Sequence, residues 1–441
     1  MTKVLTFRWQ EAERAGRTVF LVRICVLKVL AGLTAAAILM QPTPSQPSRH
    51  AGQESDSWQP IPFNSTDWQR DGAPTYRVEE GILIFDGDGR GQLMTQRTYS
   101  DFELQVEFRT SAGANNGIAL RAPLGFQASR YGMEIQILDD GAQVQPDKRR
   151  ICGAIYGLYP AAKRAVRPAG QWNTIHIRCI GRRVQVTLNG ERVVDADLNA
   201  IRDREQLRER PGFLREAGHI GFIQHNGRVE FRNLRIRELP ATRPPNQPPD
   251  GFIALFNGRD LSGWQSWYAD PPDIARMSAD ERQQAQTRAN AQHLRHWRVQ
   301  DGELVFDGQG VHLITEKPYG DFELWLDWQI EAGGDSGIYL RDTPQVQIWD
   351  NPDGSGGLYN NEQHPNRPRV KADRPPGQWN RFRILMLGER VTVWLNETLV
   401  VHDVPLENYW DRRAPLPASG HIWLQAHGTP LRFRNIFIRP L

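Results

Sequence analysis

Apolar and polar residues alternate with a period of two over many short stretches of the chain. Between 322 and 329, Phe322, Leu324, Leu326 and Trp328 alternate with neighbours that are mostly polar. This alternation predicts a strand with one face in a core. A Gly-rich turn at 333–335 follows, and a second strand is expected to begin at 336. The two strands are therefore predicted to form a β-hairpin.

The strand predicted over 345–350 carries an unusual polar face. Val346 and Ile348 point to one side, whereas Gln345, Gln347 and Trp349 point to the other. Two amides and an indole can hydrogen-bond and stack on a sugar ring. We interpret this face as a binding surface for carbohydrate. The alternative is an ordinary polar outer face with one exposed tryptophan.

The same pattern of segments occurs twice in the chain. YSDFEL at 99–104 matches YGDFEL at 319–324, and GQWN occurs at both 170–173 and 377–380. Further matches continue in the same order as far as FRN, which begins at Phe231 in one copy and at Phe433 in the other. A repeat unit of this length is a domain, far longer than a solenoid repeat. The chain is therefore predicted to hold two tandem domains.

The first repeat contains eight short alternating segments, which are bounded by Gly and Asn turns. They lie at 82–85, 102–108, 117–120, 133–138, 174–180, 184–188, 220–224 and 229–237, with a helical-looking interruption at 199–215. This pattern favours an antiparallel β-sandwich. The second repeat has the same pattern with an insertion at 270–295, where Ser278 and Glu281 form a capping-box pattern before a polar helix.

Five regions follow from composition. The expected boundaries are a leader at 1–40, a flexible tether at 41–57, the first sandwich at 58–239, a Pro-rich linker at 240–250 and the second sandwich at 251–441. The leader is basic over 1–28 and uncharged over 29–40, which predicts an export signal. An uncleaved membrane anchor is the alternative. We expect a periplasmic or extracellular protein.

Charge and cysteine content exclude several classes of function. The net charge is +3, but residues 1–40 hold six basic and two acidic residues, so the remainder is nearly neutral. There is no basic field of the kind that nucleic-acid binding needs. Cys179 continues an apolar alternation and is expected to be a buried thiol, with a disulfide to Cys152 as the alternative. No cofactor or metal is predicted, because the Asp-Gly turns at 86–89 and 353–354 are more typical of exposed turns than of calcium loops.

The second repeat resembles the 3-keto-disaccharide hydrolase domain family. The resemblance rests on six blocks, at 252–264, 334–341, 345–350, 377–380, 424–428 and 433–436. The first repeat looks like a more diverged copy. The resemblance implies an all-β fold of two tandem concanavalin A-like jelly-roll sandwiches, with a small helical insertion in the second. It also implies exported bacterial proteins that act on sugars oxidised at C3.

A sugar with a ketone at C3 suggests a particular chemistry. A base removes the acidified hydrogen on C2, the glycosidic oxygen on C1 leaves, and water addition completes a net hydrolysis. Such a site needs a base, donors for the enolate oxygen and a platform for the ring. This differs from the paired carboxylates of other glycosidases. The candidates in the second repeat are Asp350 or His427 as base, Arg341 and Gln347 as donors, Gln345 and Gln425 as further sugar ligands, Trp349 as platform and Arg434 to orient a carboxylate.

The first repeat offers matching candidates. They are Arg121, Glu134, Gln136, Asp139, His225 and Arg232, and adjacent Gln224 and His225 stand for the Gln-x-His of the second repeat. Glu134 lies where the second repeat has Gln345. If this acid is the base, the first repeat is the catalyst; if Asp350 or His427 is the base, the second can act alone.

Other interpretations remain open at this point. Arg341 and Arg434 also fit structural salt bridges, and His427 also fits a turn-stabilising role. Trp325, Trp394 and Trp423 have no tryptophan counterpart in the first repeat and suit either sugar platforms or core filling. A carbohydrate-binding protein without turnover, or an extracytoplasmic scaffold that binds a partner protein, would use the same faces. Laminarinase-type activity is disfavoured, because neither repeat has a Glu-x-Asp-x-x-Glu strand.

Overall fold

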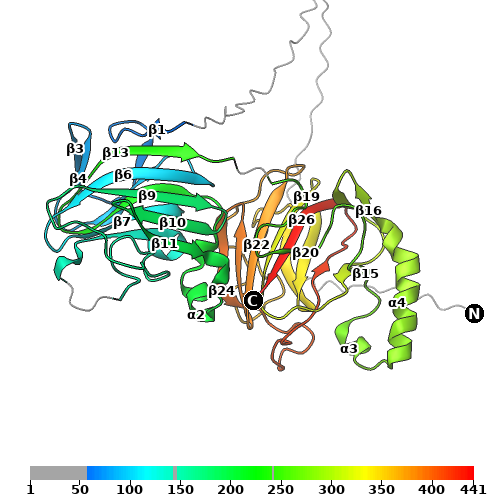
Figure 1. The fold of residues 1–441 in the computed structure, drawn as a ribbon. Helices are drawn as coiled ribbons and strands as arrows, with labels where there is room; N and C mark the ends of the chain where they lie inside the picture. The colour runs from blue at the N-terminus through cyan, green and yellow to red at the C-terminus, as the bar shows by residue number, and fades with distance from the viewer. Residues whose placement is uncertain (1–56, 143–146, 241–242) are drawn as a thin grey trace, which may run out of the picture. The chain divides into compact units, whose positions relative to one another are not determined.

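The alternating stretches form antiparallel strands in two successive β-sandwiches (Figure 1). The computed structural model describes residues 57–142, 147–240 and 243–441. The predicted leader and nearly all of the tether therefore lie outside the described residues. Within the described residues, each sandwich pairs an eight-stranded sheet, here called the large sheet, with a five-stranded small sheet.

The eight strands predicted for the first sandwich all form, and further strands join them. Its large sheet has the order β11 (Glu191–Asp197), β10 (Arg183–Leu188), β9 (Asn173–Ile180), β6 (Phe102–Thr110), β13 (Val229–Glu238), β4 (Ile82–Phe85) and β3 (Tyr76–Glu79), with β1 (Gln59–Pro60) beside β13. Its small sheet has the order β2 (Trp68–Ala73), β5 (Arg90–Thr95), β12 (His219–Asn226), β7 (Asn115–Ala122) and β8 (Met133–Leu138). The strands that join the predicted ones are β1, β2, β3, β5 and β11.

The second sandwich repeats this topology strand for strand. Its large sheet has the order β24 (Thr398–Pro405), β23 (Arg390–Leu395), β22 (Asn380–Leu387), β19 (Phe322–Ile330), β26 (Leu431–Pro440), β17 (Glu303–Phe306) and β16 (Trp297–Gln300), with β14 (Ile253–Ala254) beside β26. Its small sheet has the order β15 (Trp264–Ser266), β18 (Leu313–Thr315), β25 (Trp423–Leu424), β20 (Asp335–Leu340) and β21 (Thr343–Trp349). The fold class expected from sequence, two tandem jelly-roll sandwiches, is confirmed.

Helices are few and mostly short within the described residues, and they lie in the connections. The α-helices are α1 (Ala128–Tyr131), α2 (Arg204–Glu209), α3 (Pro271–Ile274) and α4 (Ala279–His293), and the 3-10 helices are η1 (Asp140–Ala142), η2 (Leu198–Ala200), η3 (Pro211–Leu214) and η4 (Leu294–His296). The capping box of α4 is formed by Ser278 and Glu281. Gln286 on α4 donates to the carbonyl of Ser266 at 2.8 Å, so the helical insertion is fixed beside β15 (Figure 1).

Each sandwich has a core built from the inward residues of both sheets. Val346, Ile348 and Leu424 of the second small sheet are fully buried in one such core. Cys152 and Cys179 are buried in the core of the first sandwich, and both are free thiols. The alternation that predicted the strands therefore also defines which face of each sheet is turned away from the core.

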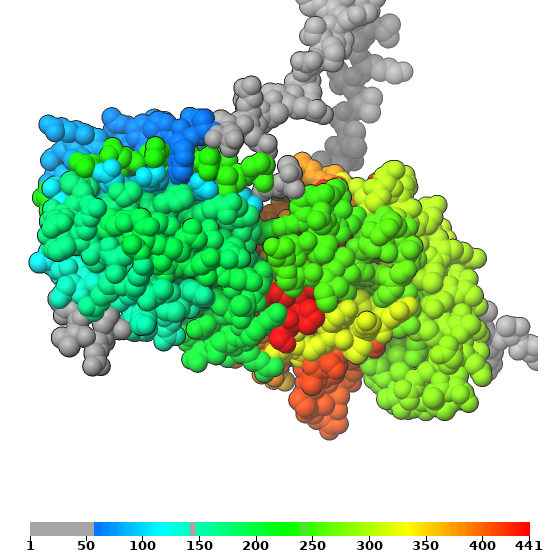
Figure 2. All heavy atoms as spheres, in the orientation of Figure 1, coloured from blue at the N-terminus to red at the C-terminus, as the bar shows by residue number. Residues whose placement is uncertain are grey.

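The outer face of the second large sheet packs against the first sandwich, and the atoms of the two sandwiches are in contact in the space-filling view (Figure 2). Leu385, Leu387, Trp394 and Leu399 join the apolar cluster of the first sandwich. Because Trp394 is 2% exposed in this contact, it is not a sugar platform.

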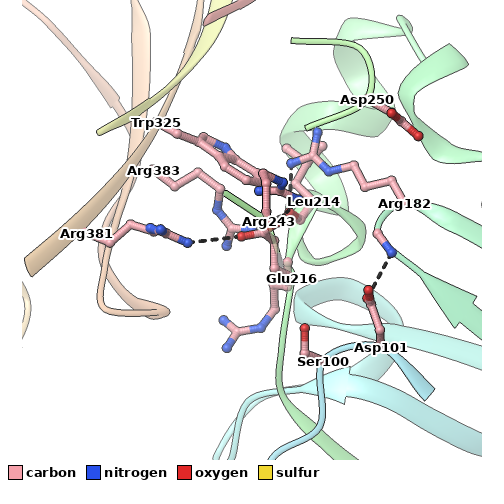
Figure 3. Close-up of polar contacts among 12 residues, drawn as sticks. Ser100, Asp101, Arg182, Leu214, Glu216, Arg243, Asp250, Trp325, Arg381 and Arg383 are labelled. Atoms are coloured by element: carbon pink, nitrogen blue, oxygen red, sulfur yellow. Dashed lines mark hydrogen bonds and ion pairs between the residues drawn. The ribbon is translucent and has the colours of Figure 1, made fainter. Parts of the chain in front are cut away.

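Polar side chains of both sandwiches meet at the same contact, where Arg381 lies 3.3 Å from Glu216 (Figure 3). A buried ion-pair network lies beside them. Glu323, which is fully buried, accepts from Arg182 of the first sandwich at 2.7 Å and from Arg439 at 2.9 Å. Burial alone would raise the pKa of Glu323, but the two guanidinium groups hold it at about 2. Trp325, 3% exposed, donates its indole N–H to Glu323 at 2.7 Å and so belongs to this contact and to no sugar site.

No helix in the described ranges has the length and apolar character that a membrane span requires.

Candidate functional site

The outer face of the second small sheet gathers most of the polar candidates, and it is called the site face here. On β21, Val346 and Ile348 enter the core, so Gln345, Gln347 and Trp349 point away from it. The same alternation places Asp335 and Tyr339 of β20 on the site face. Residues 421, 423 and 425, in and around β25, lie on it too.

A chain of side-chain hydrogen bonds runs across the site face. The Gln345 amide donates to the Gln347 amide oxygen, and Gln347 Nε2 donates to Asp335 Oδ1 at 2.7 Å. Asp335 Oδ2 lies 3.7 Å from Nδ1 of His427. Thr429 also hydrogen-bonds the backbone of Asp335, at 3.1 and 3.0 Å. The carboxylate is thus fixed on one oxygen and faces an imidazole with the other.

Gln425 contributes an acceptor that has no partner among the described residues. Its side chain is 8% exposed, Nε2 lies 3.5 Å from the Tyr339 hydroxyl, and Oε1 is buried without a hydrogen bond. A buried amide oxygen without a partner costs free energy, typically about 1–3 kcal/mol. A bound hydroxyl group would satisfy it. Burial raises the pKa of Tyr339 to about 12, so its hydroxyl remains a proton donor.

His312, next to the first residue of β18, lies beside Tyr339 and Trp423 on the same outer face. Its ring is 5.6 Å from Tyr339 and 5.9 Å from Trp423, and its Nδ1 accepts the backbone N–H of Ala426 at 3.0 Å. Burial lowers the pKa of His312 to about 4, and the nearby His427 contributes to this decrease. His312 is therefore neutral at physiological pH and carries its proton on Nε2.

Aromatic rings lie at two edges of the polar side chains on the site face. Trp349 is the register partner of Asp335 and meets the half-exposed ring of Tyr359 edge-on, at 5.4 Å. Its indole N–H donates to the carbonyl of Gly354 at 2.7 Å, which fixes the ring. On the other side Trp423, 2% exposed, is stacked parallel to Tyr339 at 4.9 Å. Trp349 is thus held at a fixed orientation at one edge of the face, whereas Trp423 is covered by Trp267 and Trp410.

A second carboxylate and imidazole pair lies at the far end of the face. Asp342 accepts from Nδ1 of His421 at 2.9 Å and from the indole of Trp423 at 2.7 Å. The indole of Trp410 donates to the Asp342 carbonyl at 2.7 Å. Asp335 is the first residue of β20 and Asp342 lies two residues beyond its end, a separation of about 20 Å at strand rise. The two pairs therefore cannot act on one glycosidic bond.

Asp350 lies next to the site face but serves the backbone. Its Oδ2 accepts the N–H of Gly333 at 3.0 Å, and its own N–H donates to the carbonyl of Gly334 at 2.9 Å. Asp139 does the same in the first sandwich, where it accepts the N–H of Gly113 at 2.9 Å. Both aspartates hold the turn before the hairpin.

Arg341 and Arg121 are also structural. Arg341 is 2% exposed and donates to Asp321 at 2.6 Å and to the carbonyl of Gly320 at 2.8 Å. Arg121 is fully buried and makes the equivalent contacts with Asp101 and Ser100. Neither guanidinium reaches the outer face of its small sheet.

Arg434 and Arg232 lie on the large sheets, on the opposite side of each core. Arg434 lies 4.0 Å over the ring of Trp379, and Arg232 lies 3.8 Å over the ring of Trp172. Arg232 also donates to Glu107 at 2.8 Å. These arginines fix the repeated GQWN segments and are not brought together with the polar candidates.

The first sandwich places Glu134, Gln136 and His225 on its corresponding face. Gln136 Nε2 donates to Oδ1 of Asn115 at 2.6 Å, which repeats the contact of Gln347 with Asp335. Burial raises the pKa of Glu134 to about 7. Strand pairing shows which residues of the two sandwiches correspond. Ile223 pairs with Gly117, and Gln425 donates its backbone N–H to the carbonyl of the equivalent Gly337. Ile223, and not Gln224, therefore corresponds to Gln425, and His225 corresponds to His427.

Sequence reasoning missed Asp335, Tyr339, His312 and the Asp342 pair. The sequence pattern assigns Asp335 to the preceding turn, but β20 begins at this residue. Counting back by twos from Tyr339 along the strand places it on the same face as the glutamines, and this signal could have found it. No comparable sequence pattern marks Asp342, whose role depends on a turn.

No group of three or more His, Cys, Asp or Glu side chains in the described ranges is arranged to hold a metal ion. The side chains that the face offers for chemistry are an imidazole beside a carboxylate, several amides, a phenol and an indole. Together with two jelly-roll sandwiches, this defines a carbohydrate-active protein of the lectin-like β-sandwich class.

The chain belongs to the family of 3-keto-alpha-glucoside-1,2-lyase-like domains, whose model matches residues 51–237 and 251–439. A 3-keto-disaccharide hydrolase of Bacteroides thetaiotaomicron is 24% identical over 268 residues, which is 48% of this chain and 85% of that protein. Membership of the family suggested by sequence is thus confirmed. The chain is a glycoside hydrolase-like, carbohydrate-active protein.

The comparison with solved structures includes two bacterial examples. A Parabacteroides distasonis protein, provisionally described as a glycosyl hydrolase, is 27% identical with a TM-score of 0.38 and covers 42% of this chain and 100% of its own. The carbohydrate-binding module CBM66 of Bacillus subtilis is 14% identical with a TM-score of 0.29 and covers 40% and 98% of the two chains.

Proposed function

We propose that this protein cleaves the glycosidic bond of a 3-keto-glycoside or 3-keto-disaccharide on the site face of the second sandwich. The observation that carries the proposal is the hydrogen-bonded group of Gln345, Gln347 and Asp335, with His427 3.7 Å from the Asp335 carboxylate. Beside it lies the Gln425 acceptor, which lacks a partner among the described residues. The family description names a lyase and the Bacteroides relative is named a hydrolase. Elimination followed by hydration satisfies both names.

The residues divide into base, donors and platform. His427 takes the proton from C2, and the Asp335 carboxylate stabilises the imidazolium that forms. The electron pair of the C2–H bond moves toward the C3 carbonyl and forms the enolate. The enolate then returns to the ketone, the C1=C2 double bond forms and the C1–O bond breaks, and the aglycone oxygen takes the proton held by His427 as it leaves. The Tyr339 hydroxyl and the Gln345 amide are the donors for the enolate oxygen at C3. Water then adds across the double bond, with hydroxyl to C1 and a proton to C2.

Binding relies on the remaining groups. Gln425 Oε1 accepts from a sugar hydroxyl, which removes the cost of burying this oxygen without a hydrogen bond. Trp349, held by its bond to Gly354, offers its ring face to the pyranose.

The test uses purified full-length chain with 3-keto-trehalose and methyl 3-keto-glucoside, and the unoxidised sugars as controls. Release of product from the keto sugars alone is expected. In deuterated water, the product should carry deuterium on C2, because elimination exchanges that hydrogen with solvent. Release without deuterium on C2 would refute the elimination, and binding without release would leave a lectin-like protein.

We also propose that the chain acts outside the cytoplasm. The support is the basic segment 1–28 followed by the apolar segment 29–40. Cell fractionation of a bacterial host should recover the protein from the periplasm, the membrane or the medium, and recovery from the cytoplasm would contradict it.

A further inference from the structure

Apart from the helical insertion of the second sandwich, the two sandwiches differ in the connection between the last two strands of the small sheet. In the second sandwich, Arg341 and Asp342 form a two-residue turn between β20 and β21, with φ of 52° and 61°. In the first sandwich, the connection from β7 to β8 runs through residues 123–132 and includes α1. This longer connection is called the α1 segment here.

The α1 segment folds back over the outer face of the first small sheet. Ala128 packs in one apolar cluster with Met94, Ala119 and Ala122, and all four residues are at most 2% exposed. The amide of Gln92 donates to the carbonyl of Phe126 at 2.9 Å. The segment therefore covers the residues that correspond to Ile314 and Tyr339 of the second sandwich.

The α1 segment is also held from its other side. Arg210 donates to the carbonyl of Ser129 at 2.8 Å, and Arg130 donates to the carbonyl of Glu209 at 2.9 Å. Gly212 of η3 lies directly on the segment, because a Cβ there would be 2.0 Å from the carbonyl carbon of Tyr131. Contacts on both sides make the segment part of the fold.

Several residues of the site face in the second sandwich are replaced by residues of another type at the corresponding positions of the first sandwich. Strand pairing aligns Ala119 with Tyr339 and Ile223 with Gln425. Asn115 takes the position of Asp335, so the imidazole of His225 does not face a carboxylate at this position. Its Nδ1 lies 3.0 Å from the amide oxygen of Asn226 instead.

We propose that the first sandwich is a sealed copy without a sugar site, and that each chain binds one sugar ligand, in the second sandwich. The identity of the ligand rests on the proposed function, whereas the sealing of the first sandwich does not. What the first sandwich provides is the surface that covers the outer face of the second large sheet.

The experiment measures binding stoichiometry by calorimetry on the full chain. The probe is a 3-keto C-glycoside, which has no leaving oxygen and is not consumed. One site per chain is expected. His427→Ala should weaken binding at least tenfold, whereas the matched variant His225→Ala should leave affinity and stoichiometry unchanged. Two sites per chain, or weaker binding in His225→Ala, would overturn the proposal.

A second measurement decides the case in which no sugar binds and the proposed function fails. The backbone N–H groups of Tyr131 and Gly132 donate to the carbonyls of Gln127 and Ala128. In hydrogen–deuterium exchange these two amides should be protected to the same degree as the amides of β7. Exchange of these two amides within seconds would show that the segment opens and would refute the sealing of the first sandwich.

Discussion

Asp335→Asn is the substitution that most directly tests the site. The first sandwich shows that asparagine fits, because Asn115 accepts from Gln136 at 2.6 Å, just as Asp335 accepts from Gln347 at 2.7 Å. The variant should therefore keep its hydrogen bond, and its free energy of unfolding should lie within about 1 kcal/mol of the wild-type value. What it loses is the negative charge 3.7 Å from His427.

The magnitude follows from that distance. Two unit charges about 4 Å apart interact by roughly 1 kcal/mol in water and roughly 4 kcal/mol at a protein surface. The Asp335 side chain is 37% exposed and that of His427 is 56% exposed, so their interaction lies between these two limits. We take the interaction energy of the carboxylate with the imidazolium as about 2 kcal/mol. This is the stabilisation of the imidazolium in the transition state, and it corresponds to about a 30-fold decrease in kcat.

The assay is initial-rate kinetics on methyl 3-keto-glucoside, with chemical denaturation of the same samples. KM should change little, because the asparagine introduced by the substitution still accepts from Gln347 and holds it in place. The matched variant Asn115→Asp, in the first sandwich, should keep the wild-type kcat. A kcat for Asp335→Asn within threefold of the wild type would refute the role of the carboxylate.

Two further substitutions and two pH effects are expected. Gln425→Leu should weaken sugar binding about 3- to 10-fold by calorimetry without lowering Tm, because it removes a buried acceptor that has no partner among the described residues. Arg341→Ala should cost about 3–5 kcal/mol in urea unfolding, since it removes the buried guanidinium that neutralises Asp321; an affinity loss at normal stability would contradict this. The pKa of His312 is about 4 in the folded protein, below its usual 6.5, so the unfolded chain binds more protons between pH 4 and pH 6.5. The free energy of unfolding should therefore decrease as the pH drops from 6.5 to 4, and His312→Gln should remove the contribution of this residue to the decrease. The pKa of Glu134 is raised from 4.5 to about 7, so the folded protein binds more protons and stability should fall as pH rises from 4.5 to 7, an effect that Glu134→Gln should abolish.

The sequence alone was sufficient for the sandwiches, the duplication and the polar strand face. Alternation with a period of two is a local property, so Val346 and Ile348 could be placed in the core, and Gln345 and Gln347 on the opposite face, without any tertiary information. The same reasoning stopped one residue short at Asp335, because a Gly-rich turn hides where a strand begins.

The environments of Arg341 and Trp394 could not be predicted from sequence, because the residues that contact them lie far away along the chain. Arg341 is neutralised by Asp321 from another strand connection, and Trp394 is covered by the first sandwich. Which charged or aromatic side chains face solvent is decided by packing between segments, and one-dimensional patterns do not contain that information.

The division of labour between the copies likewise depends on tertiary structure. The sequence shows Glu134 where the second copy has Gln345, and this suggested either copy as the catalyst. The structure shows that a longer strand connection lays α1 over the first small sheet, whereas the second sandwich has only a two-residue turn at this point. A loop's length is visible in sequence, but the surface it covers is fixed only when its apolar residues find a place to be buried.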